Sequence, residues 1–233
     1  MTHNSFGTLY IVSTPIGNLK DITFRAVEIL SSVSMIAAED TRHSNKLLQH
    51  YDISTPSISF FEHNRSARIP QIMNYLKKGD HVALISDAGT PGISDPAYKL
   101  IREAIAEEIT IESIPGPTAL IAAIVSSGLP TDRFIFEGFL PPKKGRKKRL
   151  MNLVSQDATI IFYESPYRLI KTLEEINEII GNRPAVIARE LTKMNEEIIR
   201  GTVSEILSYF TNKKPRGEFV IMIGKNDSNV FFK

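Results

Sequence analysis

The sequence predicts an α/β fold with two α/β domains, the first built on a mainly parallel sheet and the second on a mixed sheet. Short apolar segments alternate with helical patterns through the first half of the chain. Such alternation is typical of parallel strands joined by right-handed crossovers, with helices on both faces of the sheet. Pro115, Gly116 and Pro117 interrupt the pattern, which then restarts. We therefore expect domains at residues 1–117 and 118–233.

Five short apolar segments, bounded by turn residues or helical patterns, predict the strands of the first domain. These strands are expected at residues 9–12, 35–38, 57–60, 81–85 and 110–114. The segments between them carry helical patterns, at residues 23–32, 44–51, 65–78 and 95–107. In the third of these, Ile69, Ile72, Met73 and Leu76 have the spacing of one helix face.

The second domain is expected to begin with a helix at residues 118–127. Three apolar segments then predict strands, at residues 134–137, 159–163 and 185–188. The last two strand-like segments, 197–203 and 218–223, enclose a helical pattern at 204–210. The short helix between these two late strands differs from the regular alternation of the first domain.

The composition is that of a globular protein, with 42% hydrophobic and 23% charged residues among 233. The absence of cysteine excludes a disulfide framework, a thiolate metal site and a cysteine nucleophile. No apolar segment approaches the roughly 18 residues that span a bilayer, and residues 1–5 lack the pattern of a signal peptide. We therefore expect a soluble cytoplasmic protein without membrane contact.

The positive charge of the chain is concentrated in one segment. Six of the seven residues at positions 143–149 are basic, namely Lys143, Lys144, Arg146, Lys147, Lys148 and Arg149. Without them the 28 basic residues fall to 22 against 26 acidic residues, a net charge of −4. Such a local cluster predicts a docking patch for a polyanion, with a solvated mobile loop as the alternative.

Glycine and proline gather in the turns that follow three of the predicted strands. The turns are residues 13–18, 86–92 and 115–118. Short crossovers often need such residues, but ligands of open α/β sheets bind beyond the carboxyl ends of the strands. Three turns of this kind at one edge favour a slot that holds a polar, extended small molecule through backbone groups. Asp87 would contact that molecule or close an Asx turn.

Several common cofactor motifs are absent from the sequence. No G-x-G-x-x-G follows the first strand and no G-x-x-x-x-G-K-[ST] occurs, which argues against a Rossmann dinucleotide site and a P-loop. The five histidines are scattered, and no metal-binding spacing such as H-E-x-x-H is present. We therefore expect no metal.

Charged and hydroxyl side chains follow three other predicted strands, at residues 61–64, 163–168 and 189–193. Two of these positions have simpler structural interpretations. Asn64 is expected to cap a helix, and Ser165 with Pro166 to begin one. These interpretations leave Arg168 and Glu190 without an assigned role.

Taken in order, these turns resemble the tetrapyrrole methylase superfamily, and within it the bacterial 16S rRNA ribose 2′-O-methyltransferase family, RsmI. The resemblance covers nearly the whole chain, and it rests on the order and spacing of the segments together. The matching segments are residues 9–19, 38–42, 62–64, 86–96, 115–119, 139–141, 163–168 and 189–193.

The resemblance implies a two-domain α/β fold, a homodimer, and S-adenosylmethionine held in the cleft between the domains. The positions that it assigns to the cofactor are Pro15, Gly17, Asp87, Ala88, Gly89, Thr90, Ile93, Thr118, Ala119, Glu164 and Leu191. Family members often extend further at the C-terminus, whereas this sequence ends nine residues after Gly224. RNA binding would then rest on the basic cluster, a dimer partner or the ribosome.

The activity implied is methylation of a cytidine ribose 2′-oxygen in 16S rRNA of the small ribosomal subunit, in the decoding region. Residues expected to supply a base or to orient the reacting groups are Glu62, Asn64, Glu164, Arg168, Glu190 and Lys193. Phe60, Phe61 and Tyr163 would stack bases or pack in the core. Two alternatives stay open, a small-molecule tetrapyrrole methyltransferase and a non-catalytic RNA-binding protein.

Overall fold

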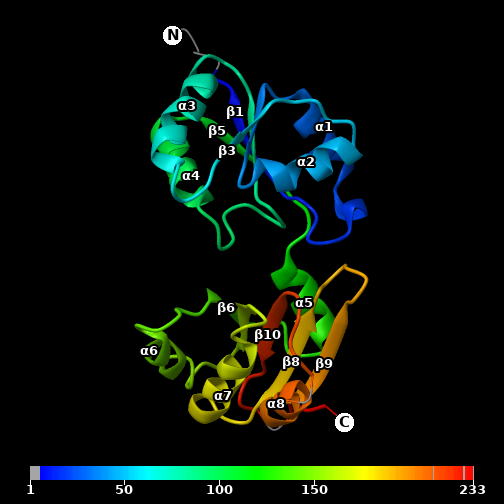
Figure 1. The fold of residues 1–233 in the computed structure, drawn as a ribbon. Helices are drawn as coiled ribbons and strands as arrows, with labels where there is room; N and C mark the ends of the chain where they lie inside the picture. Colours follow the sequence, from blue (N-terminus) through cyan, green and yellow to red (C-terminus); the bar gives the residue numbers. More distant parts are fainter. Residues whose placement is uncertain (1–5, 212, 228, 233) are drawn as a thin grey trace. The chain divides into compact units, whose positions relative to one another are not determined.

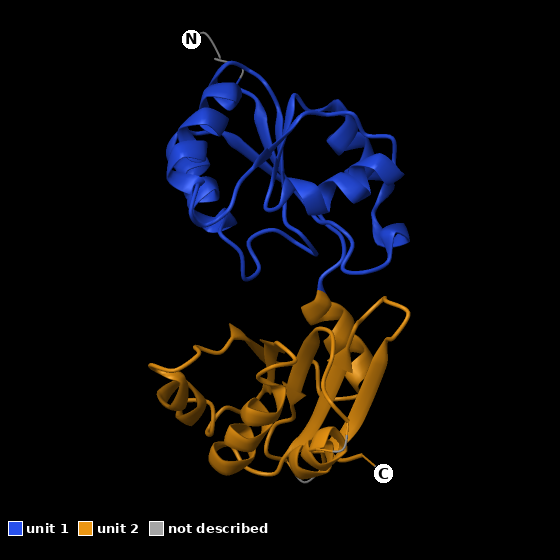
Figure 2. Ribbon diagram, viewed as in Figure 1, with its two compact units in different colours: residues 1–118 blue, residues 119–233 orange. Residues whose placement is uncertain are grey.

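The computed structural model describes residues 6–211, 213–227 and 229–232, and the chain forms two compact units (Figure 1). Unit 1 comprises residues 1–118 and unit 2 residues 119–233 (Figure 2). Each unit has its own sheet, and the predicted α/β class is confirmed for both. No helix within the described residues is long and apolar enough to cross a membrane.

Unit 1 is built on a five-stranded, all-parallel sheet of order β3-β2-β4-β1-β5. Its strands are β1 (Thr8–Val12), β2 (Met35–Ala38), β3 (Ser57–Ser59), β4 (Val82–Ile85) and β5 (Thr110–Ile114). Its α-helices are α1 (Phe24–Ser32), α2 (Thr41–His50), α3 (Arg65–Lys77) and α4 (Ala97–Ala106). The parallel sheet predicted for the first half of the chain is therefore confirmed.

Helices cover both faces of this sheet, with α1 and α2 on one side and α3 and α4 on the other (Figure 1). Successive side chains of a strand point to opposite faces. In β2, Met35 and Ala37 accordingly join the core cluster of α3 and α4, whereas Ile36 and Ala38 join that of α1 and α2. Burial on both faces explains why the inner strands β2 and β4 are apolar throughout, without alternation.

Two local features of unit 1 differ from the sequence-based expectation. A short 3-10 helix, η1 (Leu19–Asp21), follows the first turn. Helix α2 begins at Thr41, three residues before the expected start, because the Asp40 side chain accepts a hydrogen bond from the Arg42 N–H and caps the helix.

Unit 2 has a mixed sheet of order β6-β7-β10-β8-β9, in which β6 and β7 are parallel and the other neighbours antiparallel. Its strands are β6 (Phe134–Phe139), β7 (Thr159–Glu164), β8 (Pro184–Arg189), β9 (Glu197–Thr202) and β10 (Phe219–Ile223). Its helices are α5 (Ala119–Ser127), α6 (Arg146–Met151), α7 (Leu169–Ile179) and α8 (Val203–Thr211). The predicted mixed sheet is confirmed.

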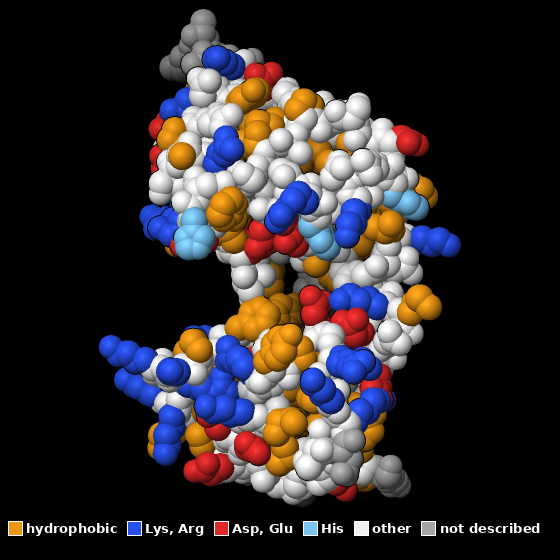
Figure 3. All heavy atoms as spheres, viewed as in Figure 1, with side chains coloured by type: hydrophobic (Ala, Val, Ile, Leu, Met, Phe, Trp, Pro, Cys, Tyr) orange, Lys and Arg blue, Asp and Glu red, His pale blue; other side chains and the backbone are white. Residues whose placement is uncertain are grey.

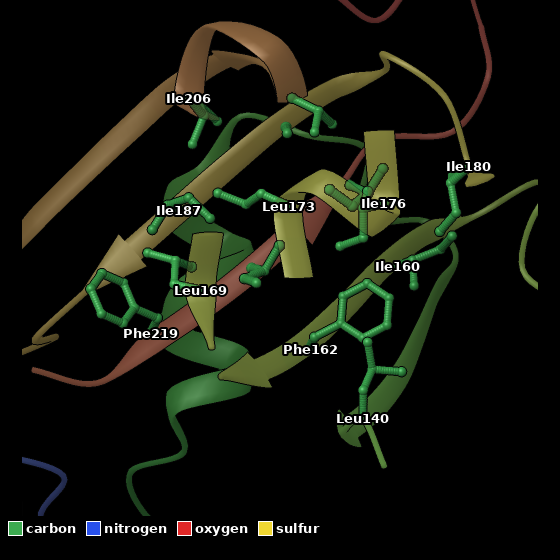
Figure 4. Close-up of a cluster of buried hydrophobic side chains, with 14 of the residues drawn as sticks. Leu140, Ile160, Phe162, Leu169, Leu173, Ile176, Ile180, Ile187, Ile206 and Phe219 are labelled. Atoms are coloured by element: carbon green, nitrogen blue, oxygen red, sulfur yellow. The ribbon is translucent and has the colours of Figure 1, made fainter. Parts of the chain in front are cut away.

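The core of unit 2 lies between this sheet and its helices. Phe162 and Ile187 from the sheet meet Leu169, Leu173 and Ile176 of α7 (Figure 4). The segment at residues 146–149, expected as a docking patch or a mobile loop, is part of α6, whose Leu150 is fully buried in the same core. The basic cluster therefore stands on a packed helix.

Candidate functional site

The three glycine- and proline-rich turns of unit 1 meet at one edge of its sheet. Strand β1 lies between β4 and β5, so the turns after these strands are neighbours. Thr14 and Gly89 exchange two backbone hydrogen bonds, with N···O distances of 2.9 and 3.0 Å. The turns after β1 and β4 are thereby joined directly beyond the ends of their strands. This edge, residues 13–18, 86–93 and 115–118, is called the unit 1 edge below.

A cluster of hydroxyl groups connects the three turns of the unit 1 edge. Thr90 Oγ1 lies 2.9 Å from Ser13 Oγ and 2.7 Å from Thr118 Oγ1, and it donates to the Pro117 carbonyl at 3.2 Å. Thr14 Oγ1 donates to the Ser86 carbonyl. These side chains use their polar atoms to connect the turns, so Thr90 and Thr118 have structural contacts at positions predicted to bind a cofactor.

Two glycines allow the turns to approach each other closely. A Cβ on Gly116 would lie 2.9 Å from the Cβ of Ser13, closer than packed carbon atoms come. Gly89 has φ +84°, in the region that glycine adopts without strain. The glycines predicted to admit a ligand therefore also serve the packing of turn against turn. Gly17, Ala88 and Ile93 are exposed, whereas Pro15 is buried.

Asp87 does not close an Asx turn within its own loop. Its Oδ1 accepts a hydrogen bond of 2.9 Å from the Asp40 N–H, and its own N–H donates to Glu39 Oε2 at 3.4 Å. Because β2 and β4 are neighbours, these bonds join the turns that follow them. Asp87 thus links the charged turn at residues 39–42 to the unit 1 edge.

Glu39 and Asp95 form an acidic pair whose properties the sequence analysis missed. Both line a small hollow with Phe60 and Ser86, beyond the ends of β2 and β4. Burial raises the pKa of Glu39, and the negative charges of Asp87 and Asp95 add to that effect. Burial also raises the pKa of Asp95. A signal was present in the sequence, since Glu39 directly follows a strand that is apolar throughout.

The turn after β3 is fastened by Asn64. Its Oδ1 accepts from the Phe61 N–H at 2.9 Å, and its Nδ2 donates to the carbonyl and hydroxyl oxygens of Ser59. Asn64 occupies the expected N-cap position of α3, but its side chain makes no cap hydrogen bond, because the amide bonds backward to the turn. Glu62 is exposed and pairs with Arg65. Phe60 is only 2% exposed, which excludes it as a stacking surface.

Glu164, at the end of β7, is buried and fully engaged. It is 2% exposed, and its oxygens accept from the Ser165 N–H at 2.8 Å and from Thr172 Oγ1 at 2.7 Å. Arg168 Nε lies 3.3 Å and Arg146 Nη1 3.9 Å from the same carboxylate. Two hydrogen bonds and two nearby guanidinium groups therefore surround this carboxylate inside unit 2. The catalytic role expected for Glu164 stays a prediction.

Arg146 departs from the predicted patch of six exposed cations. It is 5% exposed, pairs with Glu175, and donates to Thr172 Oγ1 at 2.6 Å and to the Pro141 carbonyl at 3.3 Å. Because Arg146 is buried and its guanidinium group is already hydrogen-bonded, it does not belong to the surface that RNA would contact. Arg149 is half-exposed and pairs with Glu137. The four lysines of the cluster, Lys143, Lys144, Lys147 and Lys148, are exposed.

The turn after β8 is a strained and ion-paired loop. Glu190 and Thr192 have φ values of 50° and 65°, which side chains of this kind seldom adopt. Lys193 Nζ lies 3.0 Å from Glu190 Oε1 and 2.8 Å from Glu218 Oε2. Although burial alone would raise the pKa of Glu190, hydrogen bonds from Lys193 and the Glu218 N–H lower it. Leu191, predicted to face a cofactor, is 9% exposed.

Tyr163 occupies a position that connects β7 with α5. Its hydroxyl accepts a hydrogen bond of 3.0 Å from the Leu120 N–H in the first turn of α5, beside Ala119. Its ring packs edge-on against Phe136 and Phe139. The ring is thus used inside unit 2, and the expectation that Tyr163 stacks a base is not supported. Phe61, by contrast, is exposed.

Comparisons with known proteins identify the family. Residues 8–207 match the family described as Tetrapyrrole (Corrin/Porphyrin) Methylases. A protein of Synechocystis named ribosomal RNA small subunit methyltransferase I is 52% identical, over 93% of this chain and 78% of that protein. The protein of the same name from Thermotoga maritima is 50% identical, over 93% of this chain and 98% of that protein.

Solved structures show the same fold at much lower identity. A diphthine synthase aligns with a TM-score of 0.75 and 12% identity, over 94% of this chain and 90% of that chain. A cobalt precorrin-4 methyltransferase aligns with a TM-score of 0.70 and 19% identity, over 93% and 94%. The chain belongs to the tetrapyrrole methylase family and, within it, to the ribosomal RNA small subunit methyltransferase I family.

Proposed function

We propose that this chain is an S-adenosylmethionine-dependent methyltransferase that methylates a cytidine ribose 2′-oxygen in the 16S rRNA of the small ribosomal subunit. The observation that carries the proposal is the unit 1 edge, where the Thr14–Gly89 pairing and the Thr90 cluster lock three adjoining turns. The relatives named for rRNA methylation support the choice of substrate. The four exposed lysines on and beside α6 support a polyanionic one.

The residues of the unit 1 edge fit a polar, extended cofactor. Their own hydroxyl groups are bonded to one another, so the edge is rigid before any ligand arrives. Gly17 is exposed and carries no side chain, so a ligand can approach its backbone closely. S-adenosylmethionine, when bound, supplies a methyl group on a sulfonium centre that leaves as a neutral thioether. We assign its binding in unit 1 to Pro15, Gly17, Ala88, Gly89, Thr90, Ile93 and Thr118.

Methylation of a ribose requires a group that takes the proton of the 2′-hydroxyl as its oxygen bonds to carbon. Among the predicted carboxylates, Glu164 is buried and accepts hydrogen bonds from the Ser165 N–H and Thr172 Oγ1, and hydrogen bonds from Lys193 and the Glu218 N–H lower the pKa of Glu190. Glu62 is exposed, and Glu39 has a raised pKa, as a general base requires. We assign the base to Glu39 or Glu62, and ribose positioning to the turn that Asn64 holds.

The direct test is transfer of labelled methyl groups from S-adenosylmethionine to undermethylated 30S subunits, followed by mass-spectrometric mapping of the ribose. Methylation of one cytidine ribose in 16S rRNA is expected. Transfer to a porphyrinogen with none to 30S subunits would instead identify a tetrapyrrole methyltransferase. Absence of S-adenosylmethionine binding by calorimetry would identify an RNA-binding protein without catalysis.

The base assignment is tested by Glu39→Gln and Glu62→Gln with the same assay. Loss of the base is expected to lower the rate by about 10²- to 10⁴-fold while cofactor binding persists. The variant with the smaller loss serves as the control for the other. Equal, small losses in both would contradict the assignment and leave positioning alone as the source of the rate.

We also propose that the protein acts in the cytoplasm as a homodimer. The family resemblance suggests a dimer, and α5 carries exposed Ile121 and Val125 one helical turn apart, an apolar strip suited to a partner. Sedimentation equilibrium is expected to give twice the chain mass. A monomer at micromolar concentration that still methylates 30S subunits would contradict this part of the proposal.

A further inference from the structure

Two exposed aromatic rings in unit 2 take no part in the site described above. Tyr167 is 95% exposed and Phe139 is 54% exposed. Phe139 is the last residue of β6, and Tyr167 lies in the turn between β7 and α7. Exposed aromatic rings leave apolar surface in water. Exposed apolar side chains on adjoining segments mark a candidate binding site.

The two rings come from segments that the structure places next to each other. Strands β6 and β7 are parallel neighbours, with Phe139 opposite Tyr163 in the register. Arg168 Nη2 donates a hydrogen bond of 2.6 Å to the Leu140 carbonyl. The residue after Tyr167 is therefore bonded to the residue after Phe139, so the two rings are presented from the same edge of the sheet.

Both rings stand on backbone that is already fixed. Arg168 also lies 3.3 Å from the buried carboxylate of Glu164, which holds the Tyr167 turn against β7. The edge of the Phe139 ring packs on Tyr163, with ring centroids 5.7 Å apart. A preorganised aromatic surface loses little conformational entropy when a ligand stacks on it.

Cations lie directly beside this surface. Arg146 donates to the Pro141 carbonyl and to Thr172, which ties the first turn of α6 to the segment that follows Phe139. Arg146 and Leu150 are buried, whereas Lys147, Lys148 and Arg149 of the same helix are exposed. Figure 3 shows Lys and Arg side chains gathered over α6 in unit 2.

We propose that Phe139 and Tyr167 form a base-stacking platform for unpaired nucleotides of an RNA, whose phosphates lie on Lys143, Lys144, Lys147 and Lys148. Single-stranded RNA is bound by this combination, because every base has a face that stacks on an aromatic ring and a backbone that attracts cations. The platform deepens the proposed function and rests on it, since it specifies that the rRNA is recognised as an unpaired segment.

The test measures binding of an unstructured RNA of about 12 nucleotides, a length within known single-strand sites, and of the same RNA in a duplex. Tyr167→Leu keeps an apolar side chain and removes the ring, so single-strand affinity is expected to fall about tenfold. Tyr167→Phe keeps the ring and is expected to bind as the unchanged protein does. Phe139→Leu is expected to act in the same direction as Tyr167→Leu, and duplex affinity to stay constant throughout.

A matched control is available in unit 1. Tyr98 of α4 is 63% exposed, and Tyr98→Leu removes an exposed ring far along the sequence from the cations of α6. This variant is expected to leave RNA affinity unchanged. Circular dichroism and S-adenosylmethionine calorimetry on all variants check that the fold and cofactor binding are retained.

Salt dependence separates the rings from the lysines. The double variant Lys147→Glu, Lys148→Glu is expected to lower the slope of log affinity against log salt by about 0.7 for each phosphate that the protein no longer neutralises, whereas Tyr167→Leu leaves the slope unchanged. Unchanged single-strand affinity in Tyr167→Leu, or equal losses in Tyr167→Phe and Tyr167→Leu, would overturn the platform.

The proposed function can fail independently of the platform. If the unchanged protein methylates 30S subunits while Tyr167→Leu keeps full RNA affinity, the platform is wrong and the function stands. If Tyr167→Leu loses single-strand affinity as expected but the unchanged protein methylates no 30S subunit, the platform stands and the proposed function is wrong.

Discussion

The sheet edges of the two units are built from different chemistry. In unit 1 the turns beyond the strands are joined by backbone hydrogen bonds and by the hydroxyl groups of Ser13, Thr90 and Thr118. In unit 2 the corresponding turns are held by ion pairs, one set around Glu164 and one around Lys193. Hydrogen bonds between neutral groups join the three turns of the unit 1 edge, whereas ion pairs hold the turns of unit 2.

The two edges are therefore suited to two different kinds of ligand. Backbone and hydroxyl groups respond little to salt and offer a fixed outline, which suits a small cofactor of constant shape. A charged edge beside exposed lysines attracts a polyanion over a longer range, but with a strength that depends on ionic strength. The comparison predicts that substitutions in unit 2 act through charge and those in unit 1 through shape.

The largest effect is expected from Arg146→Met, which leaves Glu164 and Glu175 without their shared cation. Removing one partner of a buried ion pair costs about 3–5 kcal/mol, and here Arg168 still compensates part of the Glu164 charge, so the lower end of that range is expected. Chemical denaturation, followed by hydrogen exchange in α6 and α7, measures the loss. Arg149→Met is the control, since its pair with Glu137 is half-exposed and contributes at most about 1 kcal/mol.

An equal and small loss in Arg146→Met and Arg149→Met would contradict the assignment of a buried network. In that case α6 would be held by Leu150 and its apolar neighbours alone. Ion pairs would then not account for the stability of the turns in unit 2.

The next effect is a test of shape in unit 1. Gly116→Ala places a methyl group 2.9 Å from the Cβ of Ser13, so the turns after β1 and β5 must separate. Overpacking of this kind costs about 1–3 kcal/mol, and S-adenosylmethionine affinity is expected to fall with it. Gly145→Ala is the matched variant, because its φ of +83° strains an alanine while nothing lies within 4 Å of the added methyl.

Gly145→Ala is expected to destabilise α6 by about 1 kcal/mol and to leave cofactor affinity unchanged. Calorimetric titration with S-adenosylmethionine distinguishes the two variants. A fall in affinity in both, or in neither, would show that close approach of the turns does not shape the unit 1 edge.

The sequence allowed the inner strands of unit 1 to be predicted well because β2 and β4 are buried on both faces. Continuous apolar segments such as residues 35–38 and 81–85 have few alternatives when helical patterns separate them. The mixed sheet of unit 2 was also predicted. Helix α6 was missed, because the charges of residues 143–149 dominate the pattern and only Leu150 marks a buried face.

Side-chain roles were harder to predict than strands. Glu164 and Arg146 look like functional groups in the sequence, yet each is buried against the other and against Thr172. Their partners lie on other elements, and a single sequence carries no record of that pairing. Glu39 was overlooked for the same reason, since its raised pKa depends on burial and on Asp87 and Asp95 from a different part of the chain.

A smaller effect is expected at the hydroxyl cluster. Thr90→Val keeps the shape of the side chain and removes its oxygen, which leaves Ser13 and Thr118 short of a partner. The loss of a buried hydrogen bond costs about 1–2 kcal/mol of unfolding free energy. Thr110→Val on the exposed start of β5 is the control and is expected to be neutral. Cofactor affinity that falls with Thr90→Val but stays constant with salt would support an uncharged unit 1 edge.

The smallest effects on stability are expected from a change of pH, and they have opposite signs for Glu39 and Glu190. The pKa of Glu39 is raised above 4.5 by burial, so the folded state binds its proton more tightly than the unfolded chain does. Ionised Glu39 therefore lowers the free energy of unfolding at pH 7. This destabilisation vanishes as the pH falls below about 4.5. Glu39→Gln is therefore expected to stabilise the protein at pH 7 by less than about 1 kcal/mol and to make no difference in acid.

Glu190 in unit 2 has the opposite linkage. Burial alone would raise its pKa, but Lys193 and the Glu218 N–H lower it below 4.5. Its ionised form therefore stabilises the fold above about pH 4.5, and this contribution is lost as the pH falls through the folded-state pKa. Glu190→Gln is expected to destabilise at pH 7 and to match the unchanged protein in acid. Urea denaturation at pH 7 and at a pH well below 4.5 measures both variants, and shifts of the same sign would contradict the opposite linkage of Glu39 and Glu190.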